Sequence, residues 1–217
     1  MAIDIHSQNY IYTHNNLLFQ RVTFDNAIEA IKTQNEIFPN EDASLQVLAA
    51  CDLALFRQIT GINIPAEKSN YYLATVDNEI VGMTGLYTYA KTGKPNECWL
   101  AWYGVRDKFR SKGYGKSILE WTIRKATAEG YEVLRLHTLT DLYANAIKVY
   151  ERIGFVGEAY THELDGIAVY SLPLTDKPLD MLNGRFMNFS IEFEICNVSE
   201  KKKNEIFDKY NKFLKSA

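Results

Sequence analysis

The sequence predicts a mixed α/β domain, and three observations support this prediction. Two apolar segments, 71–76 and 80–89, flank the turn Asp77-Asn78-Glu79, which is typical of a β-hairpin because Asp and Asn tolerate positive φ. After residue 98 the apolar spacing alternates between strand and helix periods, which indicates β-α-β-α order. The composition, 47% apolar and 24% charged over 217 residues, is that of ordinary globular proteins. We therefore expect one main domain with a small appendage.

The first part of the chain predicts one strand followed by two helices. Residues 17–24 form an apolar strand segment that ends at Asp25, and Asp25 can also cap the helix that follows. Pro39 breaks the chain after this helix. Asp42 can then cap a second helix, which we expect to continue until Gly61 ends it.

The later elements complete the predicted domain in alternating order. A strand is expected over 98–105, followed by a helix over about 114–129 that ends just before Gly130. The remaining expected elements are a strand over 132–138, a helix over about 143–153, and two strands over 155–161 and 167–174.

The last part of the chain differs in character from the rest. Residues 187–195 alternate between apolar and polar side chains, which predicts a strand, and Ser199 can cap a final helix. We therefore divide the chain into a domain over 1–175 and a β-α extension over 176–217. The extension is too small to bury a core of its own, so we expect it to pack on the domain or on a second subunit. The strand at 187–195 suggests edge pairing, and hence a homodimer.

Composition excludes several classes of protein. The net charge of −3 argues against a nucleic-acid binder, and no segment approaches the roughly 18 apolar residues of a membrane span. The N-terminal sequence lacks the regions of a secretory signal, so we expect a cytoplasmic protein. The three cysteines and four histidines show neither a disulfide framework nor metal-ligand spacing, so no metal is expected.

The most informative stretch joins the strand at 98–105 to the helix at 114–129. Its glycines, Gly113 and Gly115, let a ligand approach the backbone closely. The free N–H groups and the dipole at the start of a helix attract anions. Seven Lys and Arg residues stand against two acidic ones between positions 106 and 125 of an acidic protein. This strand-loop-helix therefore predicts a phosphate-binding cradle.

Two nucleotide-binding motifs fail at this stretch. Gly115-Lys116-Ser117 resembles the end of a P-loop, but the first glycine of that motif would stand where the sequence has Arg110. The dinucleotide fingerprint needs glycine at positions 110 and 112 as well as 115, and Lys112 occupies the second of these. The cradle is therefore of another kind.

The stretch resembles the pyrophosphate loop of the GNAT family of N-acetyltransferases, which reads Arg/Gln-x-x-Gly-x-Gly/Ala. Arg110-Ser111-Lys112-Gly113-Tyr114-Gly115 matches every fixed position. The second signature of the family is similar to Asn145-Ala146-Ile147-Lys148-Val149-Tyr150-Glu151-Arg152-Ile153-Gly154-Phe155, and the strand Glu79–Leu86 also fits. The resemblance spans roughly 17–174 in the element order of the family. It implies the GNAT acyl-CoA N-acyltransferase fold, a mixed central sheet flanked by helices.

The resemblance also implies how acetyl-CoA would be bound as co-substrate. The backbone of residues 111–115 would hold the pyrophosphate, helped by Arg110, Lys112 and Lys116. The pantetheine arm would lie between two splayed strands, against Tyr103, Gly104 and Val105, with Asn145 on its other side. The backbone N–H of Val105 would donate to the carbonyl oxygen of the thioester.

Tyr150 is the candidate general acid, because it occupies the tyrosine position of the second signature. A phenol stays protonated at neutral pH and can donate a proton to the leaving thiolate. A tyrosine on an amphipathic helix is more often a core residue when no motif surrounds it. The match to the signature favours the catalytic role.

The general base is less clearly marked. Members of the family that use a strand carboxylate often place it where this sequence has Trp99. Glu97, on the same strand face, could act through a water molecule, or it could be an ordinary strand-end glutamate. His137 is a second candidate, with a side chain that titrates near neutral pH. Cys98 points to the opposite strand face and is better explained as a buried apolar thiol than as an acyl carrier.

The sequence thus predicts an N-acetyltransferase that transfers an acetyl group from acetyl-CoA to a primary amine of a small molecule or peptide, by direct attack in a ternary complex. The helices before residue 60, the turn near 86–96 and the last strands are expected to form the acceptor pocket. The alternative is a non-catalytic acyl-CoA sensor or interaction module on the same fold. A second rival would transfer a longer acyl group or use a hydroxyl acceptor.

Overall fold

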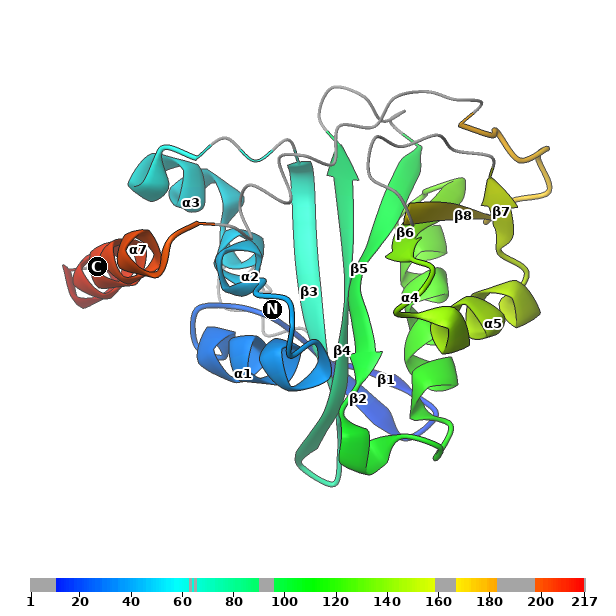
Figure 1. Ribbon diagram of the computed structural model, residues 1–217, viewed down its shortest axis with the longest axis horizontal. Helices are drawn as coiled ribbons and strands as arrows, with labels where there is room; N and C mark the ends of the chain where they lie inside the picture. The colour runs from blue at the N-terminus through cyan, green and yellow to red at the C-terminus, as the bar shows by residue number, and fades with distance from the viewer. Residues whose placement is uncertain are drawn as a thin grey trace, which may run out of the picture.

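The residues described by the computed structural model, which are 11–62, 64, 66–89, 96–158, 167–182 and 198–216, form one mixed sheet with helices on both faces (Figure 1). The order of its eight strands is β1-β2-β3-β4-β5-β6-β8-β7. All neighbouring strands are antiparallel except β5 and β6, which run parallel. The strand expected at 187–195, and with it the expected dimer edge, lies outside the described residues.

The strands and helices have the following bounds. The strands are β1 (Ile11–His14), β2 (Leu17–Arg21), β3 (Ala66–Val76), β4 (Glu79–Tyr89), β5 (Glu97–Val105), β6 (Val133–Leu139), β7 (Val156–Glu158) and β8 (Ile167–Pro173). The helices are α1 (Ala27–Ile37), α2 (Ser44–Cys51), α3 (Leu53–Thr60), α4 (Tyr114–Ala128), α5 (Ala144–Ile153) and α7 (Glu200–Ser216), with a short 3-10 helix at Asp107–Phe109.

The central elements follow the order expected from the sequence. Asp77 and Asn78 have φ values of 48° and 65° and form the tight turn between β3 and β4, as predicted. Gly61 and Gly130 both have positive φ just past the helices that they end. The mixed α/β class predicted from the sequence is confirmed.

The N-terminal helices differ from the prediction in two places. Asn26, not Asp25, precedes α1: its side chain accepts a hydrogen bond from the Thr23 N–H (2.8 Å) and donates to the Arg21 carbonyl (3.1 Å). The second predicted helix is two helices, α2 and α3, because Asp52 adopts an extended conformation between them. The Asp52 carboxylate accepts from the Leu55 N–H at 2.9 Å, so it caps a new helix instead of continuing the old one.

The two faces of the sheet support two separate cores. Helices α1, α2 and α3 lie on one side of the sheet, and α4 and α5 lie on the other (Figure 1). Because side chains alternate along a strand, the neighbours Cys98 and Trp99 point into opposite layers. Trp99 packs with residues from α1 and α2, whereas Cys98 packs with residues from α4 and α5.

The last helix, α7, packs against the α1–α3 layer. Ile206 and Tyr210 are buried in one cluster with Phe56 of α3. The Lys203 ammonium forms an ion pair with Asp42, at the entrance to α2. Ser199 accepts a hydrogen bond from the Lys202 N–H (3.4 Å) at the start of the helix, as predicted for its cap.

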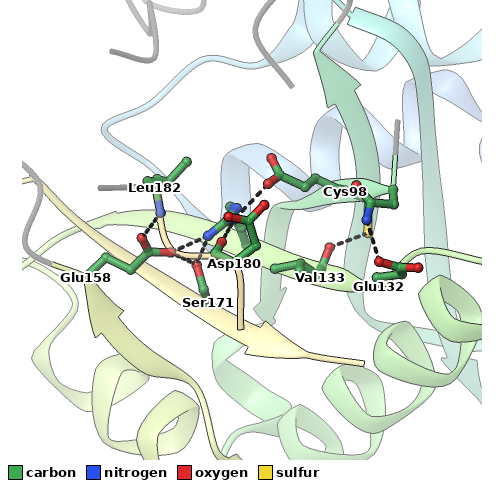
Figure 2. Close-up of polar contacts among 10 residues, drawn as sticks. Cys98, Glu132, Val133, Glu158, Ser171, Asp180 and Leu182 are labelled. Carbon is green, nitrogen blue, oxygen red and sulfur yellow. Dashed lines mark hydrogen bonds and ion pairs between the residues drawn. The ribbon is translucent and has the colours of Figure 1, made fainter. Parts of the chain in front are cut away.

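A buried arginine ties the far edge of the sheet together. The Arg135 side chain on β6 is fully buried and is bound by Glu97 of β5 and Glu158 of β7. It also donates to the Ser171 hydroxyl and to the Asp180 carbonyl, and Glu158 accepts from the Leu182 N–H. Figure 2 shows Glu158 and Ser171 beside the backbone of Asp180 and Leu182. This arginine cluster fastens the segment after β8 to the sheet.

We predict that Arg135→Met lowers the free energy of unfolding by about 3–5 kcal/mol, because it leaves two carboxylates buried without their cation. Urea denaturation monitored by circular dichroism measures this loss. Arg124→Met is the control, since Arg124 is exposed on α4 and its replacement should change stability by no more than about 0.5 kcal/mol. Equal stabilities of the two variants would contradict the prediction.

The ion pair between α7 and Asp42 predicts a pH dependence. Burial raises the pKa of Asp42, but hydrogen bonds from Lys203 and from the Ser44 N–H outweigh it, so the pKa lies below its ordinary value. The pair therefore stabilises the fold above pH ~4, and its contribution is lost as the pH falls through the depressed pKa.

We accordingly expect the stability difference between wild type and Asp42→Asn to be constant at neutral pH and to shrink below pH ~4. Unfolding free energies measured across that range test this, with exposed Asp25→Asn as the control. A difference that persists undiminished in acid would show that the carboxylate charge is not its source.

Candidate active site

The site begins where β5 and β6 diverge. Their parallel register covers only the pairs from Glu97 with Val133 to Trp99 with Arg135. Strand β5 continues to Val105 and β6 to Leu139, so their later residues face each other across a fork. The structure thus contains the splayed strands that the sequence resemblance implied.

A β-bulge reshapes β5 along this fork. Between Gly85 and Met83 of β4, the partner residues on β5 advance from Ala101 to Gly104, so β5 carries one extra residue. Trp102, inside the bulge, has a φ of 45°. This left-handed conformation is about 1–2 kcal/mol less stable than the ordinary backbone conformations of an L-residue. The bulge therefore turns the end of β5 relative to its neighbour.

The backbone after the bulge presents the Val105 N–H to the fork. The Arg106 N–H donates to the Val81 carbonyl at 2.9 Å. The pair of Gly82 with Val105 is therefore a non-hydrogen-bonded pair of the antiparallel ladder, whose peptide groups point away from the partner strand. The Val105 N–H consequently points away from β4, toward the side on which β6 has diverged.

The loop after β5 supplies an anion-binding helix terminus. Gly113 has a φ of 84° and directly precedes α4, and Ser111 also has a positive φ of 62°. The first hydrogen bond of the helix runs from the Ser117 N–H to the Gly113 carbonyl (3.2 Å). The N–H groups of the residues between them, 114–116, have no acceptor within the helix and point out of its end. Such a terminus can hold phosphate oxygens.

Tyr103 connects this loop to the fork. Its hydroxyl donates to the Gly115 carbonyl at 2.8 Å, and burial raises its pKa well above the ordinary value, so it remains a neutral donor. A Cβ at Gly115 would approach the Tyr103 oxygen to 3.2 Å, so the close packing depends on a residue without a side chain.

The basic side chains of the loop are exposed around this terminus. Arg110 donates to the Val105 carbonyl (3.2 Å) and pairs with Asp107 (2.8 Å), while Lys116 pairs with Glu120 (3.7 Å). Lys112 lies over the Phe109 ring, 5.4 Å from its centroid. These cations give the loop a positive surface that complements phosphate.

A cavity of about 200 Å³ lies in the fork. Its lining comes from the α1–α2 connection, α2, α3, β3, β4, both diverging strands, α5 and β8. Residues 90–95 of the turn expected in the acceptor pocket lie outside the described residues. The lining residues are Phe38, Glu41, Gln46, Ala49, Leu53, Ile64, Ala66, Ser69, Tyr71, Tyr87, Leu100, Ala101, Trp102, Tyr103, Leu136, His137, Thr138, Leu139, Tyr143, Ala146, Tyr150 and Ile167.

Tyr150 faces this cavity from α5. Its side chain is 7% exposed, and its ring centroid lies 5.9 Å from that of Tyr103. Tyr143, Ala146 and Tyr150 share one face of α5 because they are spaced three and four residues apart. Burial, with smaller contributions from Tyr103 and Tyr143, raises the pKa of Tyr150 far above its ordinary value. The phenol is therefore protonated at neutral pH.

The structure separates Glu97 from the other candidates. Its carboxylate, on a residue only 2% exposed, binds Arg135 at 2.8 Å and belongs to the arginine cluster rather than to the cavity lining. The expected role of Glu97 as a base acting through a water molecule stays a prediction. His137, the other candidate base, does line the cavity, from β6. Asn145 is exposed at the start of α5, one residue before Ala146 of the lining.

Sequence reasoning did not single out Glu41 and Gln46, two polar residues of the cavity wall. Glu41 accepts a hydrogen bond from the Tyr143 hydroxyl, and Gln46 accepts one from the indole N–H of Trp102. These partners are 102 and 56 residues apart in the chain, so no local spacing could have paired them. Cys98, weighed above as an acyl carrier, is fully buried, as predicted, and burial raises the pKa of its thiol well above the ordinary value.

Neither a metal-binding cluster nor a membrane-spanning helix is present among the described residues. No group of three or more His, Cys, Asp and Glu side chains is arranged to hold a metal ion within that part of the chain. None of the helices that the structure describes is long and apolar enough to cross a membrane.

Comparison with known proteins shows an acetyltransferase fold and a match to one family model. The fold is shared with solved acetyltransferase structures, and the model of the acetyltransferase (GNAT) family matches residues 31–155, more than half of the chain. The protein belongs to the GNAT family. No relative was matched among curated proteins.

Solved structures share this fold at low sequence identity. A GNAT-family protein from Desulfovibrio desulfuricans is 19% identical over 73% of this chain and 99% of its own, with a TM-score of 0.58. A GNAT acetyltransferase from Elizabethkingia anophelis, solved with acetyl-CoA bound, is 18% identical over 73% and 99%, with a TM-score of 0.51. The ribosomal-protein-S18-alanine N-acetyltransferase of Escherichia coli is 16% identical over 76% and 98%, also with a TM-score of 0.51.

Proposed function

We propose that this protein is an N-acetyltransferase that uses acetyl-CoA as its co-substrate and a primary amine as its acceptor. The observation that carries the proposal is the cavity in the β5–β6 fork, which has Tyr150 in its wall and an anion-binding helix terminus beside it. The acetyl-CoA seen in the Elizabethkingia anophelis enzyme and the amine acceptor named for the Escherichia coli enzyme support this assignment.

The residues of this chain fit the parts of acetyl-CoA. The N–H groups at 114–116 and the exposed cations Arg110, Lys112 and Lys116 would hold the pyrophosphate. The pantetheine arm would lie along Tyr103, Gly104 and Val105, with Asn145 on the opposite side. When bound, acetyl-CoA supplies the acetyl group as an activated thioester.

The polar groups of the fork have complementary roles in the proposed transfer. The Val105 N–H donates to the carbonyl oxygen of the thioester, where negative charge develops. Tyr150 gives its phenolic proton to the departing sulfur. His137 accepts the proton of the acceptor amine, directly or through water, because an imidazole titrates near neutral pH.

The first test is the melting temperature with and without acetyl-CoA. At about one hundred times the dissociation constant, binding should add about 2.7 kcal/mol, or roughly 5–10 °C for a chain of this size. Arg110→Ala should reduce the shift, and Arg124→Ala should leave it unchanged, because Arg124 is exposed on α4, away from the start of the helix. Absence of any shift in the wild type would refute the use of acetyl-CoA.

The second test is Tyr150→Phe, which removes the proton donor and keeps the buried ring. We expect kcat for thiol release to fall by about 10²-fold or more while acetyl-CoA still raises the melting temperature. Tyr170→Phe is the control, because Tyr170 lies on β8 outside the cavity lining. Turnover equal to wild type would remove Tyr150 from the mechanism. Binding without turnover in the wild type would indicate a non-catalytic acyl-CoA-binding module.

A further inference from the structure

The charge of the cavity wall is unevenly distributed. Among its described lining residues, Glu41 is the one carboxylate, and neither lysine nor arginine contributes. His137 is the remaining lining residue with an ionisable nitrogen. The wall therefore favours a cationic group over an anionic one.

Glu41 is held in place through its backbone. Its N–H donates to the Phe38 carbonyl at 3.0 Å, and its carbonyl accepts from the side chain of Gln34 at 2.9 Å. Gln34 is fully buried, and its side-chain oxygen accepts from the Ala43 N–H at 3.3 Å. The loop that carries Glu41 is thus clamped to α1 before any ligand arrives, which reduces the ordering cost of binding.

Tyr143 orients the Glu41 carboxylate from the opposite wall. Its hydroxyl donates to one carboxylate oxygen. Burial, together with this hydrogen bond and the negative charge of Glu41, raises the pKa of Tyr143 far above its ordinary value, so the phenol remains a neutral donor. An ionised carboxylate has about four acceptor positions, so the one taken by Tyr143 leaves room for an ammonium group.

Aromatic rings share the cavity wall with this carboxylate. Phe38 packs edge-to-face on Trp102, with ring centroids 5.2 Å apart, and on Tyr143 at 6.2 Å. All three side chains line the cavity. Aromatic faces attract cations and also bury apolar groups, so they suit a molecule that combines both.

We propose that Glu41 is the anionic anchor of the acceptor subsite, and that the acceptor is a cationic amine with an apolar or aromatic body. This inference rests on the proposed function, because it concerns the second substrate of the same site. A carboxylate on the acceptor, next to its amine, would be repelled by Glu41, and the described lining holds no lysine or arginine that could neutralise it. Amino acids with a free carboxylate are therefore poor acceptors.

Two amines of one skeleton test the proposal. 2-Phenylethylamine is cationic, and L-phenylalanine adds a carboxylate to the same skeleton. We expect wild-type kcat/KM to be at least tenfold higher for 2-phenylethylamine. Glu41→Gln should raise KM for 2-phenylethylamine at least tenfold and bring the two substrates close together. Glu29→Gln removes an equal charge from the exposed face of α1 and should change neither value.

Binding provides a readout that does not depend on turnover. Calorimetric titration of 2-phenylethylamine into the protein loaded with CoA should give a Kd that Glu41→Gln weakens about tenfold and Glu29→Gln leaves unchanged. If Glu41→Gln does not fold, Tyr143→Phe keeps the carboxylate and the ring, and should weaken binding several-fold by releasing the carboxylate from its donor.

The outcomes separate this proposal from the proposed function. Equal or better use of L-phenylalanine, an unchanged KM in Glu41→Gln, or binding of neither amine while acetyl-CoA still stabilises the protein would overturn the cationic subsite alone. Failure of acetyl-CoA to stabilise the protein would overturn the proposed function as well.

Discussion

The buried Arg135 cluster sits at the base of the fork on which the rest of the site depends. Arg135 and Trp99 form the last registered pair of β5 and β6. The guanidinium binds Glu97 of β5 and Glu158 of β7, and it also donates to the carbonyl of Asp180, which follows β8. Because a buried charge is tolerated only with its partners in place, the strands are pinned together at this level. Beyond this level no further residue pair of β5 and β6 is in register within the described residues, and the cavity opens between the two strands.

Backbone N–H groups are available at the open end of the fork. The bulge at Trp102 turns the Val105 N–H away from β4, while Gly113 starts α4 with its first N–H groups unbonded. Both features use peptide groups rather than side chains, so they are fixed by the fold before a ligand arrives. The side chains that line the open end include Tyr150, His137 and the hydrogen-bonded pair Glu41 and Tyr143.

Local signals in the sequence predicted the elements well where backbone conformation demands a particular residue. The turn at Asp77-Asn78 and the glycine before α4 are examples, because positive φ restricts the choice of residue there. The predictions failed where two residues compete for one role. Asn26 takes the position expected of Asp25, because its side chain accepts a hydrogen bond from the Thr23 N–H. Asp52 divides a predicted helix in two, because its carboxylate accepts a hydrogen bond from the Leu55 N–H and so caps a new helix.

The sequence by itself determined the mixed α/β class, the order of the central elements, the glycine loop that precedes α4 and the tyrosine of the second signature, because each depends on residues close together in the chain. Tertiary structure decided which charged groups meet. Glu97 matched the requirements for a base by type and strand face, yet it is bound by Arg135, 38 residues away. Glu41 had no distinguishing context, yet it accepts a hydrogen bond from Tyr143, 102 residues away. Long-range pairing of this kind is set by how the layers pack on the sheet, which no local spacing encodes.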